Sequence, residues 1–381
     1  MRSRRLVWTG IAAVGAVGAI GGAWFLSLPP AATLTTPPAI GEGETEALRA
    51  ALKLPRRRRP LIAIIGINDA TETTDYLMPY GILRRADVGD VLLLATDQGP
   101  VTLFPTLTVQ PQATIADFDA RHPDGADYVI VPAMSRDDDP VVLKWLKSQA
   151  GKGALIVGVC AGAKVVAEAG LLDGKRATTH WYYLEELLTK HPSVRYVSDR
   201  RMVADNGVVT TTGISASMPM ALTLIEAIAG REKAQAVGRE IGVTNWDARH
   251  DSGAFRFTRP FAATAIRNSL PFWNREEFGI ALSAGVDEVS IALVADAWSR
   301  TFRSRAVTFA ADKGTQESRH GVRIVPDRTA PSWPAATRLP EIDPQPARAL
   351  DGALDPIRAR YGAPTTDFVA MQLEYPTREL R

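Results

Sequence analysis

The stretch at residues 155–170, LIVGVCAGAKVVAEAG, predicts a buried strand, a sharp corner and a helix. Its first five residues are a short apolar run of the kind that parallel strands need. The small residues after Cys160 let the backbone turn and the following helix lie close to the strand. Cys160 therefore stands at the corner, off the carboxyl end of the strand, where open α/β sheets place their ligands.

Cys160 is the only cysteine in the chain, and its position suggests chemistry. A thiol at a helix N-terminus meets free amides and the positive end of the helix dipole, which favour the thiolate and lower the pKa. The alternative is a buried thiol that only fills space at the strand end. The corner position favours the reactive interpretation.

The composition excludes some classes of protein. The chain has 381 residues, a formal net charge of +2 and an ordinary charged fraction of 23%. That length suits two domains, and the balance of charge gives no sign of a nucleic-acid partner. A single cysteine excludes an intramolecular disulfide, so the redox compartment cannot be inferred from cysteine content.

The first 30 residues predict a membrane anchor. Three arginines within the first five residues precede an uncharged run over residues 6–28. That run is long enough to cross a bilayer as a helix, and the arginines hold the N-terminus inside. We therefore expect a single-pass protein of the cell membrane whose globular part lies on the outer, periplasmic side. A cleaved export signal is the alternative.

Residues 31–59 are rich in proline, threonine and alanine and then basic, which is typical of a linker. A short helix is expected over residues 44–52. The four arginines at 56–59 suit either contact with anionic lipid or simple solvation of the linker.

Residues 60–232 predict a doubly wound parallel sheet, because apolar runs alternate with helical patterns. A hairpin is expected over residues 101–109. The expected strands are 61–67, 91–96, 127–132, 155–159 and 208–212, and the expected helices are 75–86, 140–149, the segment after Cys160, and 215–229.

Two further side chains are candidates for a site with Cys160. Asp75 opens the helix after the first strand, at the carboxyl edge of the sheet. A carboxyl group against a thiolate would have a raised pKa and would donate a hydrogen bond to sulfur. His180, twenty residues after Cys160, is placed to orient the thiol or to exchange protons with it. The alternatives are a helix-terminal carboxylate for Asp75 and a histidine packed on Trp181 for His180.

Residues 159–181, VCAGA followed by AGLLDGKRATTHW, resemble the DJ-1/PfpI family, which is class I glutamine amidotransferase-like. The resemblance is to the branch that holds isonitrile hydratases and the ligand domains of AraC-type regulators. Residues 75–86 resemble the family's first helix, with Asp75 at the position of its characteristic acid. The resemblance implies a flavodoxin-like sandwich with Cys160 at the nucleophile elbow.

This sequence departs from the family pattern at two places. The third strand usually ends in a Gly-Gly pair that supplies an oxyanion amide, but here Pro132 and Ala133 follow it. Residue 161 is Ala, where the protease-like branch has a second His and the isonitrile hydratases have Thr. The expected oxyanion donors are therefore the amides of Ala161 and Ala133. AraC-type regulators also need a helix-turn-helix, and none is evident in the sequence.

Residues 233–274 read as a connection, and residues 275–381 as a degenerate partial repeat of the first domain at a constant shift of 215 residues. Glu72 falls on Asp287 and Arg85 falls on Arg300. The repeat stops before any elbow, and residues 367–371 are expected to echo the strand at 127–131. We expect this second copy to be chemically silent.

Three functions fit these observations. The first is a membrane-anchored, cysteine-dependent hydratase or hydrolase, or a redox-active protein, with Cys160 as nucleophile and Asp75 and His180 as its partners. The second is a non-catalytic module that senses a small molecule. The third is a scaffold that assembles through the repeat, with a homo-oligomer as an open alternative. We expect no cofactor, no metal and no nucleic-acid partner; the partners would be a small-molecule ligand or substrate and the membrane.

Overall fold

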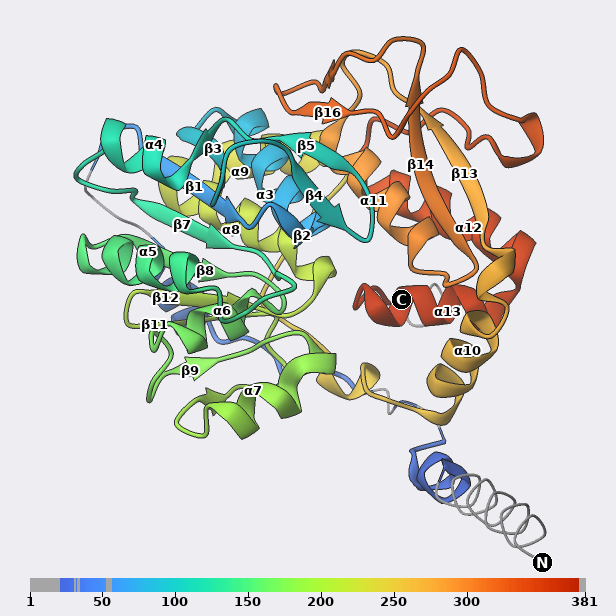
Figure 1. Cartoon of the computed structure of the whole chain (residues 1–381). Coiled ribbons are helices and arrows are strands. Elements are labelled where there is room, and N and C mark those ends of the chain that lie inside the picture. The colour runs from blue at the N-terminus through green and yellow to red at the C-terminus, as the bar shows by residue number, and fades with distance from the viewer. Residues whose placement is uncertain (1–20, 31, 33–34, 53–56, 377–381) are drawn as a thin grey trace, which may run out of the picture.

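The computed structural model describes residues 21–30, 32, 35–52 and 57–376. Figure 1 shows a central sheet with helices on both sides, and a second group of strands and helices packed against one flank. The fold is a mixed α/β sandwich built on a parallel sheet, which confirms the predicted fold class.

The main sheet has seven strands in the order β11-β12-β8-β7-β1-β3-β6. Neighbouring strands are parallel except β11, which runs antiparallel to β12 at one edge. β1 lies in the interior between β3 and β7, as its apolar sequence predicts. The strands are β1 (Leu61–Gly66), β3 (Asp90–Ala95), β6 (Ala113–Thr114), β7 (Tyr128–Val131), β8 (Leu155–Gly158), β11 (Met202–Asp205) and β12 (Val208–Thr211).

The side chains of β1 alternate between two apolar cores, one on each face of the sheet. Ile62 and Ile64 belong to the core that holds the buried residues of α3, α8 and α9, whereas Ala63 and Ile65 belong to the core of α4, α5, α6 and α7. The helices are α3 (Thr73–Ala86), α4 (Ile115–Arg121), α5 (Pro140–Gly151), α6 (Gly162–Glu168), α7 (Leu184–Lys190), α8 (Ser217–Ala229) and α9 (Arg231–Ile241).

The expected hairpin forms from β4 (Val101–Phe104) and β5 (Thr108–Gln110), which pair antiparallel. These strands leave the main sheet and join a second sheet with the order β15-β16-β5-β4-β2, in which β2 is Asp69–Glu72. Two short strands beside the main sheet, β9 (Arg176–Ala177) and β10 (Arg195–Tyr196), pair with each other.

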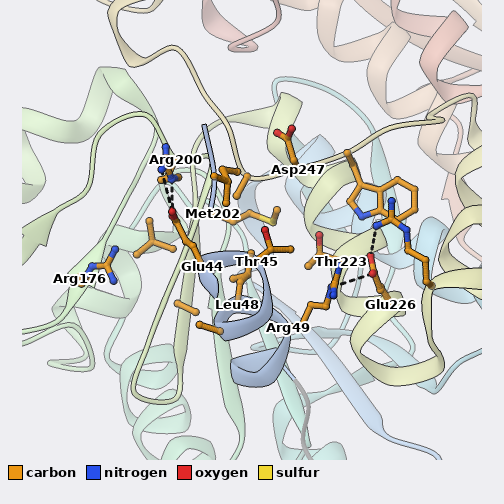
Figure 2. Close-up of a pocket in the computed structure, with 17 residues that line it drawn as sticks. Glu44, Thr45, Leu48, Arg49, Arg176, Arg200, Met202, Thr223, Glu226 and Asp247 are labelled. Carbon is orange, nitrogen blue, oxygen red and sulfur yellow. Dashed lines mark hydrogen bonds and ion pairs between the residues drawn. The ribbon is translucent and has the colours of Figure 1, made fainter. Parts of the chain in front are cut away.

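The expected short helix of the linker is present as α2 (Glu42–Leu52), and it packs against the domain. Leu52 is fully buried, and its carbonyl accepts a hydrogen bond of 2.7 Å from the Tyr128 hydroxyl. Figure 2 shows Glu44 facing Arg200, to which it is ion-paired at 2.6 Å, beside a small cavity of about 130 Å³ under the helix. The linker is thus attached to the body of the domain along this helix.

Two of the linker arginines are paired with carboxylates of the domain. Arg57 lies 2.7 Å from the buried Asp127, and Arg59 lies 2.8 Å from Asp90. The expectation that these side chains contact lipid or are merely solvated is wrong for both, because the strand ends beside them present acidic partners that the linear sequence does not reveal.

Within residues 21–30, 32, 35–52 and 57–376, no helix has the length and apolar character that a bilayer span requires. Most of the predicted span at residues 6–28 lies outside the described residues, which include only the short helix at 21–27 from that region. The membrane helix stays a prediction.

The second half follows the first at the expected shift of 215 residues. β13 (Glu276–Ala281), β16 (Arg323–Val325) and β17 (Arg328–Thr329) have the bounds of β1, β5 and β6 moved by that number. α11 (Glu288–Ser299) and β14 (Ser304–Ala310) begin within one residue of the shifted α3 and β3. The pairing of β14 with β17 also repeats that of β3 with β6, since Ala310 opposes Thr329 as Ala95 opposes Thr114.

The two halves meet through equivalent elements. α11 packs on α3, and β16 pairs antiparallel with β5 so that Ile324 lies opposite Val109, its own counterpart at the shift of 215. Such pairing is what a local two-fold axis between the halves would produce. One sheet therefore runs from one half into the other, through β15 (Gln316–Glu317) and β16.

The last part of the chain does not continue the repeat. Residues 367–371, expected as a strand, belong to the helix α13 (Ala363–Gln372), so that expectation is wrong. A five-residue apolar run does not distinguish strand from helix, and here Pro364 near the N-terminus of the segment favours the helix. α10 (Arg259–Ser269) lies in the connection, and α12 (Pro346–Tyr361) precedes α13.

Candidate active site

The elbow forms as the sequence predicts. β8 ends at Gly158, α6 begins at Gly162, and between them Cys160 has a left-handed φ of 57°. A non-glycine residue at positive φ is strained and persists only when its surroundings hold it. The Cys160 amide donates to the Thr211 hydroxyl at 3.3 Å, and the Cys160 carbonyl accepts from the Thr179 hydroxyl at 3.0 Å.

The thiol is nearly closed off from solvent, because Cys160 is only 5% exposed. Burial raises the pKa of the thiol well above its ordinary value, and the carboxylates of Asp75, Glu72 and Glu374 raise the pKa further. The amide of Ala161 acts in the opposite direction, but it does not compensate. The expectation of a thiolate favoured by the helix N-terminus is therefore wrong for this closed conformation, in which desolvation outweighs the dipole.

Asp75 lies in the first turn of α3 and is completely buried. The Ala133 amide donates a hydrogen bond of 3.1 Å to Oδ2, whereas Oδ1 has no hydrogen-bond partner. Burial raises the pKa of Asp75 well above its ordinary value, and the charge of Glu72 adds to the shift. The carboxyl is accordingly protonated near neutral pH and has an O–H that it can donate.

Asp75 and Cys160 influence each other electrostatically, as the sequence predicts. The charge of Asp75 is the second-largest cause of the raised pKa of Cys160, after burial. Two acidic groups in one dry site cannot readily ionise together, so one proton remains between them when the first leaves. The pair can therefore exist as a thiolate with a neutral carboxyl group beside it.

The two expected oxyanion donors have different surroundings. The Ala161 amide acts on the Cys160 sulfur. The Ala133 amide is donated to Asp75, as described above, and so is already engaged in this conformation. Its role here is to position the acid, which the sequence did not suggest.

His180 lies beside the elbow but uses both ring nitrogens elsewhere. Nε2 is 2.9 Å from the Gln372 carbonyl, and Nδ1 accepts from the Tyr182 amide at 3.2 Å. This arrangement requires the neutral Nε2–H tautomer. Burial also lowers the pKa of His180. His180 thus ties the end of α13 to the segment after the elbow, and its exchange of protons with the thiol stays a prediction.

Arg300, from the second half, reaches this site. Its guanidinium lies 2.7 Å from Glu72 and 2.8 Å from Asp296. Glu72 in turn caps α3 by accepting from the Asp75 amide at 2.6 Å. The second half therefore helps to position the acid of the first.

The equivalent ion pair across the interface joins Arg85 to Asp287. These two residues are the counterparts of Arg300 and Glu72 at the shift of 215. The sequence comparison pairs these positions, but it does not show that each arginine crosses to the acid of the other half.

Glu374 is a further acidic group near the thiol that the sequence did not single out. It is buried just after α13 and contributes to the raised pKa of Cys160. No motif surrounds it, and its sequence separation from the elbow leaves no local signal that could have identified it.

One cluster among the described residues brings ligand-type atoms of Asp287, Glu288 and His320 within 4.8 Å of one another. Its atoms already serve protein partners: Glu288 Oε1 is 2.6 Å from His320 Nδ1, and Asp287 is bonded to Arg85. We interpret the cluster as part of the packing between the halves.

Comparison with known proteins follows the same boundaries. Residues 62–227 match the model of the DJ-1/PfpI family. An isonitrile hydratase of Pseudomonas putida is 36% identical over 43% of this chain and 70% of its own length. The HTH-type transcriptional regulator CdhR of Pseudomonas aeruginosa is 27% identical over 50% of this chain and 55% of its own length. The crystal structure of Drosophila melanogaster DJ-1beta is 25% identical, with a TM-score of 0.44, and covers 49% of this chain and 100% of that one.

Proposed function

Because the chain belongs to the DJ-1/PfpI family, we propose that its first domain is a cysteine-dependent hydratase with Cys160 as the nucleophile and Asp75 as the acid. The observation that carries the proposal is a strained elbow cysteine beside a buried acid with one oxygen free of hydrogen bonds. The name of the relative that is 36% identical indicates an isonitrile as the substrate class.

The proposed chemistry needs only these two groups and water. The sulfur of Cys160 bonds to the terminal carbon of R–N≡C, and the thiol proton, relayed by Asp75, goes to the same carbon. The product of this step is a thioimidate, R–N=CH–S-enzyme. Water then adds to that carbon, a proton moves to nitrogen, and the carbon–sulfur bond breaks. The formamide R–NH–CHO leaves, and the thiol is restored.

We expect the full chain to convert an alkyl isonitrile to its formamide, followed as loss of the isonitrile infrared band. Cys160→Ser should lower kcat by at least about 10³-fold, because serine is a far weaker nucleophile without an adjacent base. The circular dichroism of the variant should be unchanged. Equal turnover by the folded serine variant would exclude Cys160 as the nucleophile, and no turnover by the wild-type chain would remove the hydratase assignment.

The second candidate function is sensing of a small molecule without turnover. It is supported by the closed thiol and by the Ala133 amide, which is engaged by Asp75. Similarity to a transcriptional regulator over 55% of that regulator's length is consistent with a ligand-binding domain. Ligand affinity that is the same in wild type and Cys160→Ser, without turnover, would favour this function.

We further propose that the second half is a degenerate, chemically silent copy of the first domain that acts as a built-in partner. The supporting facts are the shifted element bounds, the pairing of Ile324 with Val109, and the reciprocal ion pairs of Arg85 and Arg300. The copy covers α3 with α11, so a homo-oligomer would need a different surface.

The location that we propose is the outer face of the cell membrane, with the N-terminal segment as the anchor. The support is the arginine-flanked apolar run at residues 6–28. Separation of membrane and soluble fractions after expression of the full chain tests this; recovery in the soluble fraction without cleavage would contradict it.

A further inference from the structure

The carboxylate of Glu374 lies in a cradle of backbone amides. Oε1 accepts from the Trp181 amide at 2.8 Å, and Oε2 accepts from the Gly213 amide at 2.8 Å. The Nε2 atom of His250 lies 3.5 Å from Oε2. We call the two amides together with His250 the carboxylate cradle. Both oxygens of a fully buried carboxylate are thus held by donors that lie far from it in sequence.

The cradle is shaped for a carboxylate at close range. A Cβ atom on residue 213 would lie 2.9 Å from the Glu374 carboxyl carbon, so glycine is what permits the approach. The ring of His250 is stacked on Phe255, with 5.3 Å between centroids, which fixes its position. Glu374 itself adopts a left-handed φ of 47°, which is unfavourable for this residue type. The occupant is therefore strained, whereas the donors are in place.

The cradle adjoins the elbow through two short connections. Thr179, which bonds the Cys160 carbonyl, lies two residues before Trp181. Thr211, which bonds the Cys160 amide, lies two residues before Gly213. The effect of Glu374 on the pKa of Cys160 agrees with this proximity.

On its other side, Glu374 lines a cavity of about 980 Å³. Aromatic side chains form much of the wall, and Thr179 and Thr212 also reach it. The cavity is thus apolar along its sides and has a carboxylate-binding group at its inner end. The aromatic residues are Trp24, Trp181, Tyr182, Phe255 and Phe257.

We propose that the carboxylate cradle is a binding subsite for small carboxylic acids with an aromatic or apolar body, and that Glu374 occupies it as an intramolecular ligand. A ligand carboxylate that displaces Glu374 would take the same hydrogen bonds, and its body would lie along the aromatic wall. Displacement would also free the end of α13 and open the way to Cys160. This last consequence rests on the proposed function, whereas binding of the carboxylate does not.

The test compares the full-length wild type, Glu374→Ala and Gln372→Ala in thermal unfolding with benzoate and with benzamide. Gln372→Ala is the matched control, because it removes two side-chain hydrogen bonds of the same segment and leaves the cradle occupied. We expect benzoate to raise the Tm of Glu374→Ala by about 2 °C or more. Benzoate should leave the other two proteins unchanged, and benzamide should shift none of them.

An equal effect of benzamide and benzoate would overturn the proposal, because it would indicate apolar binding alone. No effect of benzoate on Glu374→Ala would also overturn it. If that variant does not fold, Glu374→Gln takes its place, since its side chain can offer an acceptor to only one of the two amides; an absence of benzoate binding there has the same meaning.

A second measurement separates this inference from the proposed function. Alkylation of Cys160 by iodoacetamide should be at least tenfold faster in Glu374→Ala than in wild type, and benzoate should slow it. If benzoate binds but Cys160 of Glu374→Ala reacts no faster than that of wild type, the subsite stands and its coupling to the nucleophile fails.

Discussion

Gly162→Ala is expected to prevent the first domain from folding. A Cβ atom on residue 162 would lie 1.9 Å from the Val131 carbonyl oxygen and 2.9 Å from Pro132 carbonyl atoms. These are backbone atoms at the end of β7, next to the elbow, so no side chain can rotate away. The helix α6 would have to move off the sheet, which would displace Cys160. We expect a loss of more than about 4 kcal/mol, the range in which severe steric damage falls.

The measurement is the soluble yield and urea unfolding of Gly162→Ala beside Gly352→Ala. Gly352 lies within α12, and a Cβ atom there meets nothing within 4 Å. Alanine should stabilise that helix by about 0.5–1 kcal/mol, because glycine is the poorer helix former. A Gly162→Ala protein within about 1 kcal/mol of wild type would show that α6 is not packed as described.

Arg300→Met is expected to lower the free energy of unfolding by about 3–5 kcal/mol, the usual result of leaving buried carboxylates without their cation. Arg300 serves both Glu72 and Asp296, which are buried. The pKa of Asp296 is already raised to about 7 by burial, with Glu72 adding to the shift while Arg300 opposes it. Removing the arginine would raise this pKa further.

The pH dependence of the Arg300→Met defect follows from these shifts. A carboxyl whose pKa is higher in the folded state than in the unfolded state binds more protons when folded. Stability is then lost as pH rises toward the folded pKa, so the defect should be larger at pH 8.5 than at pH 5. Urea unfolding at both values, with Arg300→Met/Glu72→Gln/Asp296→Asn as the compensated variant, measures this.

The compensated variant should recover at least half of the lost stability, because its buried groups are neutral. Arg85→Met is the matched comparison across the interface, since it strands only Asp287 among the buried acids. We expect its defect to be the smaller of the two. A defect at pH 8.5 no larger than at pH 5, or no recovery in the compensated variant, would contradict the charge assignment.

The fold of the first domain could be predicted because its information is local. The apolar run of β1, the hairpin of β4 and β5 and the corner at Cys160 each have a short-range pattern that matches their environment. The constant shift of 215 residues likewise anticipated the bounds of β13, β16 and β17. The strand expected at 367–371 failed because a short apolar run carries no period of its own.

The site could be predicted only in part, because its electrostatics depend on residues distant in sequence. Asp75 was placed correctly beside the elbow, and the direction of its pKa shift agrees with the expectation, although burial is the larger cause. The lowered pKa expected for Cys160 was wrong, because it considered the helix N-terminus and not the closure of the pocket. Glu374 and Arg300 reach the site from the other half of the chain, where no motif marks them.

The central claim is that Asp75, in its protonated form, donates a hydrogen bond to the thiolate of Cys160. The measurement is the rate of iodoacetamide alkylation of Cys160 from pH 6 to 10 in wild type, Asp75→Asn and Asp75→Leu, with each denatured chain as reference. Because burial raises the pKa of the thiol, the wild-type rate should still be rising at pH 9.

Asp75→Asn keeps a donor and should react at pH 7.5 within about threefold of wild type. Asp75→Leu lacks the donor and should react at least about tenfold more slowly, since a hydrogen bond to a charged group contributes about 1.5–3 kcal/mol. A leucine variant that reacts as fast as wild type, or faster, would show that the carboxyl acts on sulfur only through its negative charge, and would contradict the account.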